Sequence, residues 1–145
     1  MKKILVLLFV FSMSLNLSMA QSVVGKWKTI DDETGKVKSI VELSIKDGKL
    51  YGKIIKLFKA PSEEQDPICN VCPGSRKGKK VVGMTIVTAL EKDGEEWEGD
   101  DAILDPKNGK LYDCKIWLDE DHSNILNVRG YIGFFFRTQI WKRVK

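Results

Sequence analysis

The sequence has a single histidine, His122, and only three cysteines, Cys69, Cys72 and Cys114. Because nucleophilic triads rely on a positioned base, a Ser-His-Asp or Cys-His mechanism would depend on a histidine in a polar turn. Gly-x-Ser-x-Gly, HExxH, phosphate-loop and dinucleotide motifs are all missing. We therefore expect no enzymatic activity, no cofactor and no metal. Catalysis by carboxylates alone is the one enzymatic alternative that the sequence leaves open.

The sequence also lacks a strong excess of charge of one sign. It has 24 Lys and Arg residues and 20 Asp and Glu residues, which gives a net charge of +4. Nucleic-acid binding normally needs a concentrated basic face, so no nucleic-acid partner is predicted. The acidic residues in 95–101 lack the ligand spacing of a calcium loop and indicate a solvated edge. The basic cluster 76–80 indicates a solvated loop, with an anionic surface as the alternative.

Long apolar runs are limited to Ile4–Phe11, which follows two lysines and precedes small residues ending at Ala20. This run is well short of the roughly 20 apolar residues that span a bilayer. The pattern predicts a signal peptide over 1–20, with no transmembrane anchor after cleavage, and one mature domain over 21–145. No cysteine follows the run, so a lipoprotein is not expected. We expect a periplasmic or secreted protein.

No segment shows an apolar stripe at helical spacing, and turn signals recur instead, as in "DDETGK", "KDGK" and "DPKNGK". Between the turns, apolar residues alternate with polar ones: Val41, Leu43 and Ile45 share one face of "SIVELSIK". Strands are predicted near 24–31, 37–46, 49–58, 81–91, 96–104, 110–119, 124–132 and 135–143.

Eight consecutive strands joined by short turns would leave exposed edges in an open sheet, and closure removes them. The prediction is an all-β fold, a single antiparallel up-and-down β-barrel of about eight strands, with a β-sandwich as the alternative. A barrel of this size encloses packed side chains or one small ligand. The connection over 59–80 is unusually long, which is typical of a functional or pinned loop.

Cys69 and Cys72 in "DPICNVCPG" allow three interpretations. In an exported protein, a disulfide within the loop is the simplest, and on chain-entropy grounds it stabilises by only about 2 kcal/mol. A redox pair would need a thiolate stabilised by a helix N-terminus or by basic neighbours. A zinc site would normally need two more ligands. Cys114 lies on an apolar strand face, where a buried, inert thiol is expected.

Two further features concern the barrel wall. "GKW" at 25–27 predicts that Trp27 closes one end of the barrel under Arg143 or Arg137 by a cation–π contact. Arg129 in "NVRGYIG" either belongs to a solvated outer face or points inward. An inward Arg129 would need a carboxylate or an anionic ligand, because a buried unpaired charge is very costly.

Taken together, "GKW", "DPICNVCPG", "GDDAILDPKNGKLYDCKIWL", "LNVRGYIG" and "RTQIWKR" resemble the small exported bacterial family catalogued as domain of unknown function 2147. The resemblance covers about Gly25 to Arg143 and implies a lipocalin-like β-barrel, with no established activity. Two departures are the aromatic "GFFFR" and the additional Cys114.

The function predicted from these features is the binding of a small apolar or amphipathic ligand inside an exported barrel. Residues expected to line it or its mouth are Trp27, Tyr51, Tyr112, Arg129, Arg137, Gln139 and Trp141. The alternative is a non-enzymatic module of the cell envelope that binds an envelope protein or an anionic surface through the 59–80 loop.

Overall fold

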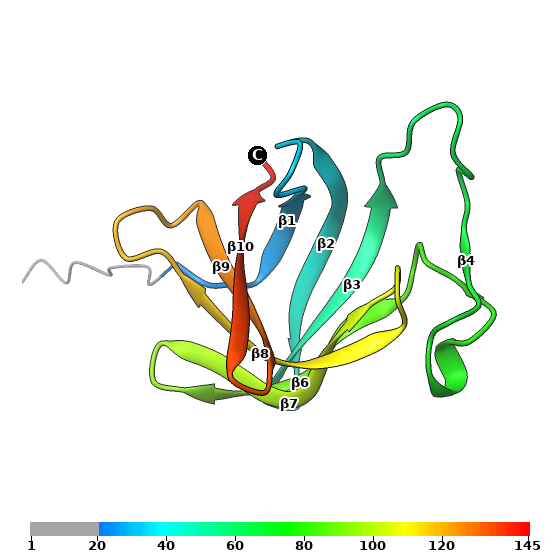
Figure 1. Cartoon of the computed structure of the whole chain (residues 1–145). Helices are drawn as coiled ribbons and strands as arrows, with labels where there is room; N and C mark the ends of the chain where they lie inside the picture. Colours follow the sequence, from blue (N-terminus) through cyan, green and yellow to red (C-terminus); the bar gives the residue numbers. More distant parts are fainter. Residues whose placement is uncertain (1–20) are drawn as a thin grey trace, which may run out of the picture.

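The computed structural model describes residues 21–145, so the predicted signal peptide lies outside the described residues. Eight antiparallel strands form a closed barrel in the order β1-β10-β9-β8-β7-β6-β3-β2 (Figure 1). Their bounds are β1 Gly25–Ile30, β2 Val37–Lys46, β3 Lys49–Leu57, β6 Thr85–Asp93, β7 Glu96–Asp105, β8 Lys110–Leu118, β9 Ile125–Ile132 and β10 Phe135–Arg143. The barrel prediction is confirmed, and the sandwich alternative is wrong. Within the described residues, no helix is long and apolar enough to cross a membrane.

The long connection between β3 and β6 contains short elements that the sequence pattern did not predict. These are β4 Ile68–Cys69, a 3-10 turn at Gly74–Arg76 and β5 Lys79–Lys80, and β4 pairs with β5. The strand expected at 81–91 begins only at Thr85, because a turn closes before it through the bond from Met84 N to Val81 O. In Figure 1 this connection extends beside the barrel.

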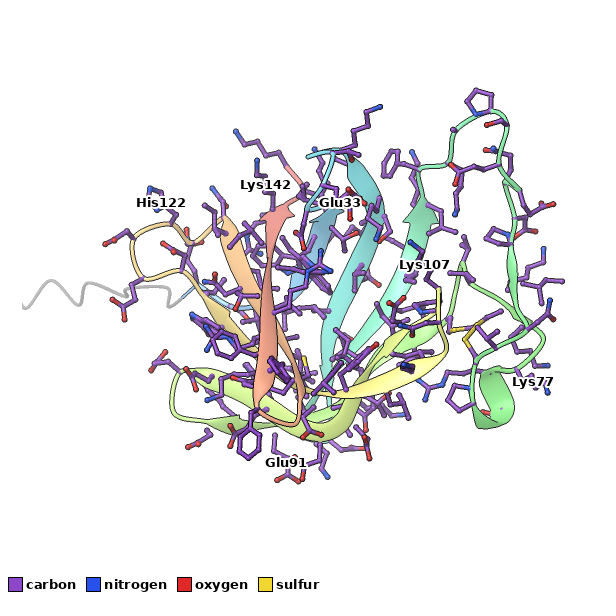
Figure 2. All side chains as sticks on the ribbon, viewed as in Figure 1. Glu33, Lys77, Glu91, Lys107, His122 and Lys142 are labelled. Atoms are coloured by element: carbon purple, nitrogen blue, oxygen red, sulfur yellow. A yellow bond between two sulfur atoms is a disulfide. The ribbon has the colours of Figure 1, made fainter. Side chains whose placement is uncertain are left out.

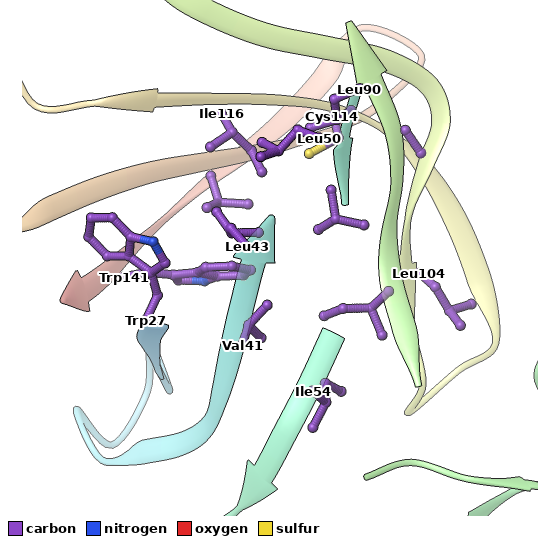
Figure 3. Packing of buried hydrophobic residues seen from close by; sticks show 14 of the residues in the cluster. Trp27, Val41, Leu43, Leu50, Ile54, Leu90, Leu104, Cys114, Ile116 and Trp141 are labelled. Atoms are coloured by element: carbon purple, nitrogen blue, oxygen red, sulfur yellow. The ribbon is translucent and has the colours of Figure 1, made fainter. Parts of the chain in front are cut away.

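The core is built from the inward faces of the barrel strands. Its largest fully buried side chains include Trp27, Leu43, Leu50, Ile116 and Trp141. Figure 3 shows Trp27 and Trp141 packed close together near Val41 and Leu43. Full burial of each such side chain contributes about 1.5–3 kcal/mol, so this cluster supplies a large share of the folding free energy.

One end of the barrel is closed by Trp27, which is 0% exposed. The indole Nε1 of Trp27 donates a hydrogen bond to the carbonyl oxygen of Val23 at 2.8 Å. The guanidinium of Arg143 lies 4.2 Å from the Trp27 ring and donates to the carbonyl oxygens of Val24 and Ser123. Burial lowers the pKa of Arg143 from its usual value. Arg143, not Arg137, therefore covers the closed end.

The opposite end of the barrel carries the other set of connections. In an up-and-down barrel successive turns alternate between the two ends, so the β1–β2, β7–β8 and β9–β10 turns lie at the same end as the β3–β6 connection. We call this end the open end.

Residues 66–84 of the connection form a small lobe, called here the cysteine lobe. It is held together by bonds from Gly78 N to the Cys69 carbonyl and from Val81 N to the Pro67 carbonyl. The lobe packs beside the β7–β8 turn, where the Cys69 Sγ lies 3.3 Å from the Pro106 carbonyl oxygen. The Cys69–Cys72 disulfide lies within the lobe, and Figure 2 shows its yellow bond on the side toward Lys107.

Candidate functional site

The inner wall of the barrel differs between its two ends. The β-sheet register pairs Val87 with Ile103, and Ile103 with Tyr112, so these three side chains share one face of the wall. Val87 pairs with Gly52, which in turn pairs with the core residue Leu43, so this face is the inner one. Ile103 and Tyr112 on this face are nevertheless only half-buried. Inward side chains therefore remain partly accessible at this end of the barrel.

Gln139 and Leu57 complete this accessible inner wall from other strands. Gln139 pairs with the buried Val128, and Leu57 pairs with the buried Ser39, so both face inward while remaining half-buried. The inward side chains are thus fully buried around Trp27 and partly accessible at the open end.

Polar groups are placed among these apolar side chains. The hydroxyl oxygens of Thr29 and Ser39 lie 2.6 Å apart in a buried hydrogen bond. The Nε1 of Trp141 donates to the Oε1 of Gln139 at 3.3 Å, and the Gln139 amide nitrogen has no acceptor among residues 21–145. The open end therefore offers apolar surface beside hydrogen-bonding groups, the composition typical of sites for amphipathic small molecules.

A hollow of about 400 Å³ lies on the wall next to Tyr112. It exists because β8 and β9 stop pairing at Asp113 and Tyr131, while β8 continues to Lys110 along β7. Its lining residues are Asp101, Lys110, Leu111, Tyr112, Asp113, Tyr131, Ile132 and Gly133. This hollow lies at the open end of the barrel.

The structure brings only part of the predicted ligand-binding set to the open end. Tyr112 and Gln139 lie on its inner wall, and Arg137 lies at the rim, where it forms an ion pair with Asp32. Trp27 and Trp141 lie in the core.

Tyr51 and Arg129 lie elsewhere. Tyr51 stands between the inward-facing Leu50 and Gly52, so its side chain lies on the outer face near the β2–β3 turn. Arg129 also faces outward, and its Nε donates to the Thr138 hydroxyl at 2.7 Å. The inward alternative for Arg129 is thus wrong.

Sequence reasoning missed Leu57 and Ile103, because irregularities change which residues face inward. The register shifts between Val87 and Glu91 in the β6–β7 pair, where Ala89 has a φ of 52° and Asp101 a φ of 46°. Simple alternation along the sequence does not reveal these shifts. The neighbouring residue Leu104 then faces outward and is still buried, at 2% exposure.

The disulfide between Cys69 and Cys72 is present, with their Cα atoms 5.5 Å apart. Both cysteines are buried, at 3% and 2% exposure, and the Cys72 Sγ lies 3.9 Å from the Met84 Sδ. Redox pairs normally expose a reactive sulfur, and the only helical element after this bridge is a three-residue turn. The bridge therefore shapes the lobe and does not resemble a redox centre.

The basic cluster lines a second, open hollow of about 610 Å³ between the cysteine lobe and β6. Arg76 donates to the Thr85 carbonyl oxygen at 3.1 Å and thereby ties the lobe to β6. Lys80 pairs with Asp66, which raises the pKa of Lys80. Among the residues described, no group of three or more His, Cys, Asp or Glu side chains is placed to hold a metal ion.

Cys114 is a buried thiol on the inner wall, and burial raises its pKa from 9.0 to about 12. We expect Cys114 to resist iodoacetamide at mildly alkaline pH in the folded protein and to react once the protein is unfolded in urea. Because the folded pKa is raised, the stabilising effect of the protonated thiol is complete below pH 9 and is lost as the pH rises toward 12. Mass spectrometry of the labelled peptide checks this, and rapid labelling of the folded protein would contradict it.

Comparison with known proteins agrees with this architecture. The family described as "Uncharacterized protein conserved in bacteria (DUF2147)" matches residues 25–143. No curated protein matches the chain. Among solved structures, the chain is similar to protein HP1028 from the human pathogen Helicobacter pylori, described as belonging to the lipocalin family. The two share 18% identity and a TM-score of 0.67, over 86% of this chain and 84% of that one. At this identity the likeness establishes a lipocalin-like fold alone.

Proposed function

The chain belongs to DUF2147, a family of uncharacterized bacterial proteins, and we propose that it is an exported barrel that binds a small apolar or amphipathic ligand at its open end. The observation that carries this proposal is the inner wall of the open end, where Ile103, Tyr112 and Gln139 face inward and remain partly accessible.

The chemistry of this wall favours an amphipathic ligand. Leu57 and Ile103 offer apolar contacts, whereas the Gln139 amide offers hydrogen bonding. A polar head group is then expected near the rim, where Arg137 supplies a positive charge that is already paired with Asp32. Apolar burial provides most of the affinity, and the polar groups orient the ligand.

Export to an oxidising compartment is part of the proposal, and the Cys69–Cys72 disulfide supports it because disulfides persist there. The second candidate function is an envelope module that acts through the cysteine lobe. The open basic hollow beside Arg76, Lys79 and Lys80 favours that candidate, since it suits an anionic partner surface.

The test is binding of a dansyl-labelled fatty acid to wild type and to the Gly130→Leu variant. Gly130 faces inward beside Tyr112, its φ is not positive, and an added Cβ would lie 3.8 Å from the Tyr112 Cβ. A leucine there fits the backbone and fills the open end. We expect wild type to enhance the probe fluorescence. Gly130→Leu should bind the probe about tenfold more weakly, because the added side chain would cost the ligand about one buried apolar contact with the wall.

Asn127→Leu is the matched control, because Asn127 lies on the same strand but faces outward, opposite Trp117. It should bind the probe as wild type does. If wild type fails to bind the probe, or if Gly130→Leu binds it equally well, the ligand-binding proposal is wrong and the envelope module becomes the better candidate. Thermal melts of all three proteins establish that each is folded.

A further inference from the structure

The β9–β10 hairpin extends beyond both of its neighbouring strands. Its own pairing runs out to Ile132 and Phe135. Pairing with β8, however, stops at Tyr131, and pairing with β1 stops at Trp141. The end of the hairpin, residues 132–136, is therefore a two-stranded ribbon with no adjacent strand in the described part of the chain. We call it the hairpin tip.

The side chains of the hairpin tip are apolar and exposed. Ile132 is 60% exposed, Phe134 103%, Phe135 81% and Phe136 60%. Gly133, at a φ of +56°, forms the turn with Phe134. Exposed apolar residues are ordinary when scattered, but four within five positions form a contiguous patch, which marks an interaction site in soluble proteins.

Positive charge lies directly behind this patch. The Arg129 guanidinium is 4.4 Å from the Phe136 ring and 5.0 Å from the Trp117 ring. Within residues 21–145, no carboxylate lies within salt-bridge distance of Arg129. Arg137 follows Phe135 by two residues, and the tip itself contains no acidic residue. The apolar hairpin tip, with the unpaired Arg129 behind it, is complementary to a surface that is negatively charged on the outside and apolar underneath.

We propose that the hairpin tip inserts into the surface of a lipid bilayer, with Phe134, Phe135 and Phe136 among the outer acyl chains and Arg129 at the phosphate groups. The shape of the tip favours a bilayer over a protein partner. Apolar side chains point from both faces of a narrow ribbon, which suits a fluid that closes around it, whereas protein interfaces are generally flat or concave patches with a polar rim. Tyr131 packs against Phe136 just behind the tip, the level at which tyrosine rings lie in membrane interfaces.

The inference is independent of the proposed ligand binding, because it rests on the outer surface of the hairpin and not on the barrel interior. It has one consequence for that function. The hollow next to Tyr112 is lined by Ile132 and Gly133 of the hairpin, so a docked tip would bring this opening to the membrane surface.

Co-sedimentation with vesicles tests the inference, using residues 21–145, which contain every barrel strand. One set of vesicles is phosphatidylcholine alone, and the other is phosphatidylethanolamine with phosphatidylglycerol. We expect wild type to bind both and to prefer the anionic set. Phe134→Ser should bind both about tenfold more weakly, because Phe134 is fully exposed and its removal costs only the contact with lipid.

Two further variants separate the apolar and the electrostatic contributions. Ile45→Ser is the matched apolar control, since Ile45 is 47% exposed at the closed end, and it should bind as wild type does. Arg129→Gln should lose the preference for anionic vesicles while retaining binding to phosphatidylcholine. Melting curves identify any variant that has lost its fold.

The inference is overturned if wild type remains in the supernatant with both kinds of vesicle. It is also overturned if Phe134→Ser binds as tightly as wild type does. If wild type ignores vesicles but self-associates with rising concentration, and Phe134→Ser does not, the tip binds a second copy of the chain. Analytical ultracentrifugation without lipid measures that outcome.

Discussion

Trp27→Ala is expected to lower the free energy of unfolding by about 3–5 kcal/mol, the range for removing a large aromatic side chain from a core. Trp27 is 0% exposed, donates its indole hydrogen to the Val23 carbonyl and lies under the Arg143 guanidinium. Alanine would remove all three contributions and open the closed end to water. Because small domains have only about 5–15 kcal/mol of stability, most of it would be lost. Urea unfolding followed by circular dichroism measures the change.

Trp117→Ala is the control for this prediction. Trp117 lies on the outer face, half-exposed, with Arg129 over its ring at 5.0 Å. Its removal takes away a surface cation–π contact worth about 0.5–1 kcal/mol together with part of its buried area, so the loss should be much smaller. Equal losses in the two variants would show that the closed end is not a principal source of stability.

Most of the fold was predictable because the patterns that determine it lie within short segments of the sequence. Asp-Gly and Asn-Gly pairs determine where the strands reverse, and alternation such as Val41-x-Leu43 marks the face that packs inward. Eight strands joined in this way have few alternatives to a closed barrel. The closing tryptophan was also predictable, since a Gly-x-Trp at the first strand places a large ring at the end of the barrel.

The accessible inner wall was less predictable, because it depends on register. Residues at Ala89 and Asp101 adopt positive φ angles, and the β6–β7 pair shifts there. Beyond the shift Ile103 faces inward, whereas Leu104 faces outward and is nevertheless buried. Neither Ala nor Asp carries the strong turn preference of glycine, so nothing in the sequence signals the change of face.

The cysteine lobe escaped prediction for a different reason. Its elements are two or three residues long, too short for any periodicity. The lobe is positioned by contacts with residues distant in sequence, such as the approach of the Cys69 Sγ to the Pro106 carbonyl. The disulfide itself was predictable from spacing and compartment, but the surface against which the lobe packs was not.

Gly109→Ala is expected to displace the cysteine lobe and to cost about 3 kcal/mol or more, because it combines backbone strain with a steric clash. Gly109 has a φ of +73°, and an added Cβ would clash with the carbonyl oxygen of Val71. That atom belongs to the backbone of the lobe and cannot rotate away as a side chain would. Urea unfolding gives the cost, and limited trypsin digestion reports cleavage within the exposed basic cluster if the lobe moves.

Gly35→Ala is a closely matched control. Gly35 has a φ of +69°, and its backbone nitrogen bonds to Asp31 O at 2.8 Å, as that of Gly109 bonds to Asp105 O. The two turns therefore share the same strain, about 1 kcal/mol for alanine in this conformation. Around Gly35, however, no atom lies within 4 Å of the added Cβ. The difference between the two variants isolates the contact between lobe and turn, and equal costs without new cleavage would mean that the lobe does not pack against the β7–β8 turn.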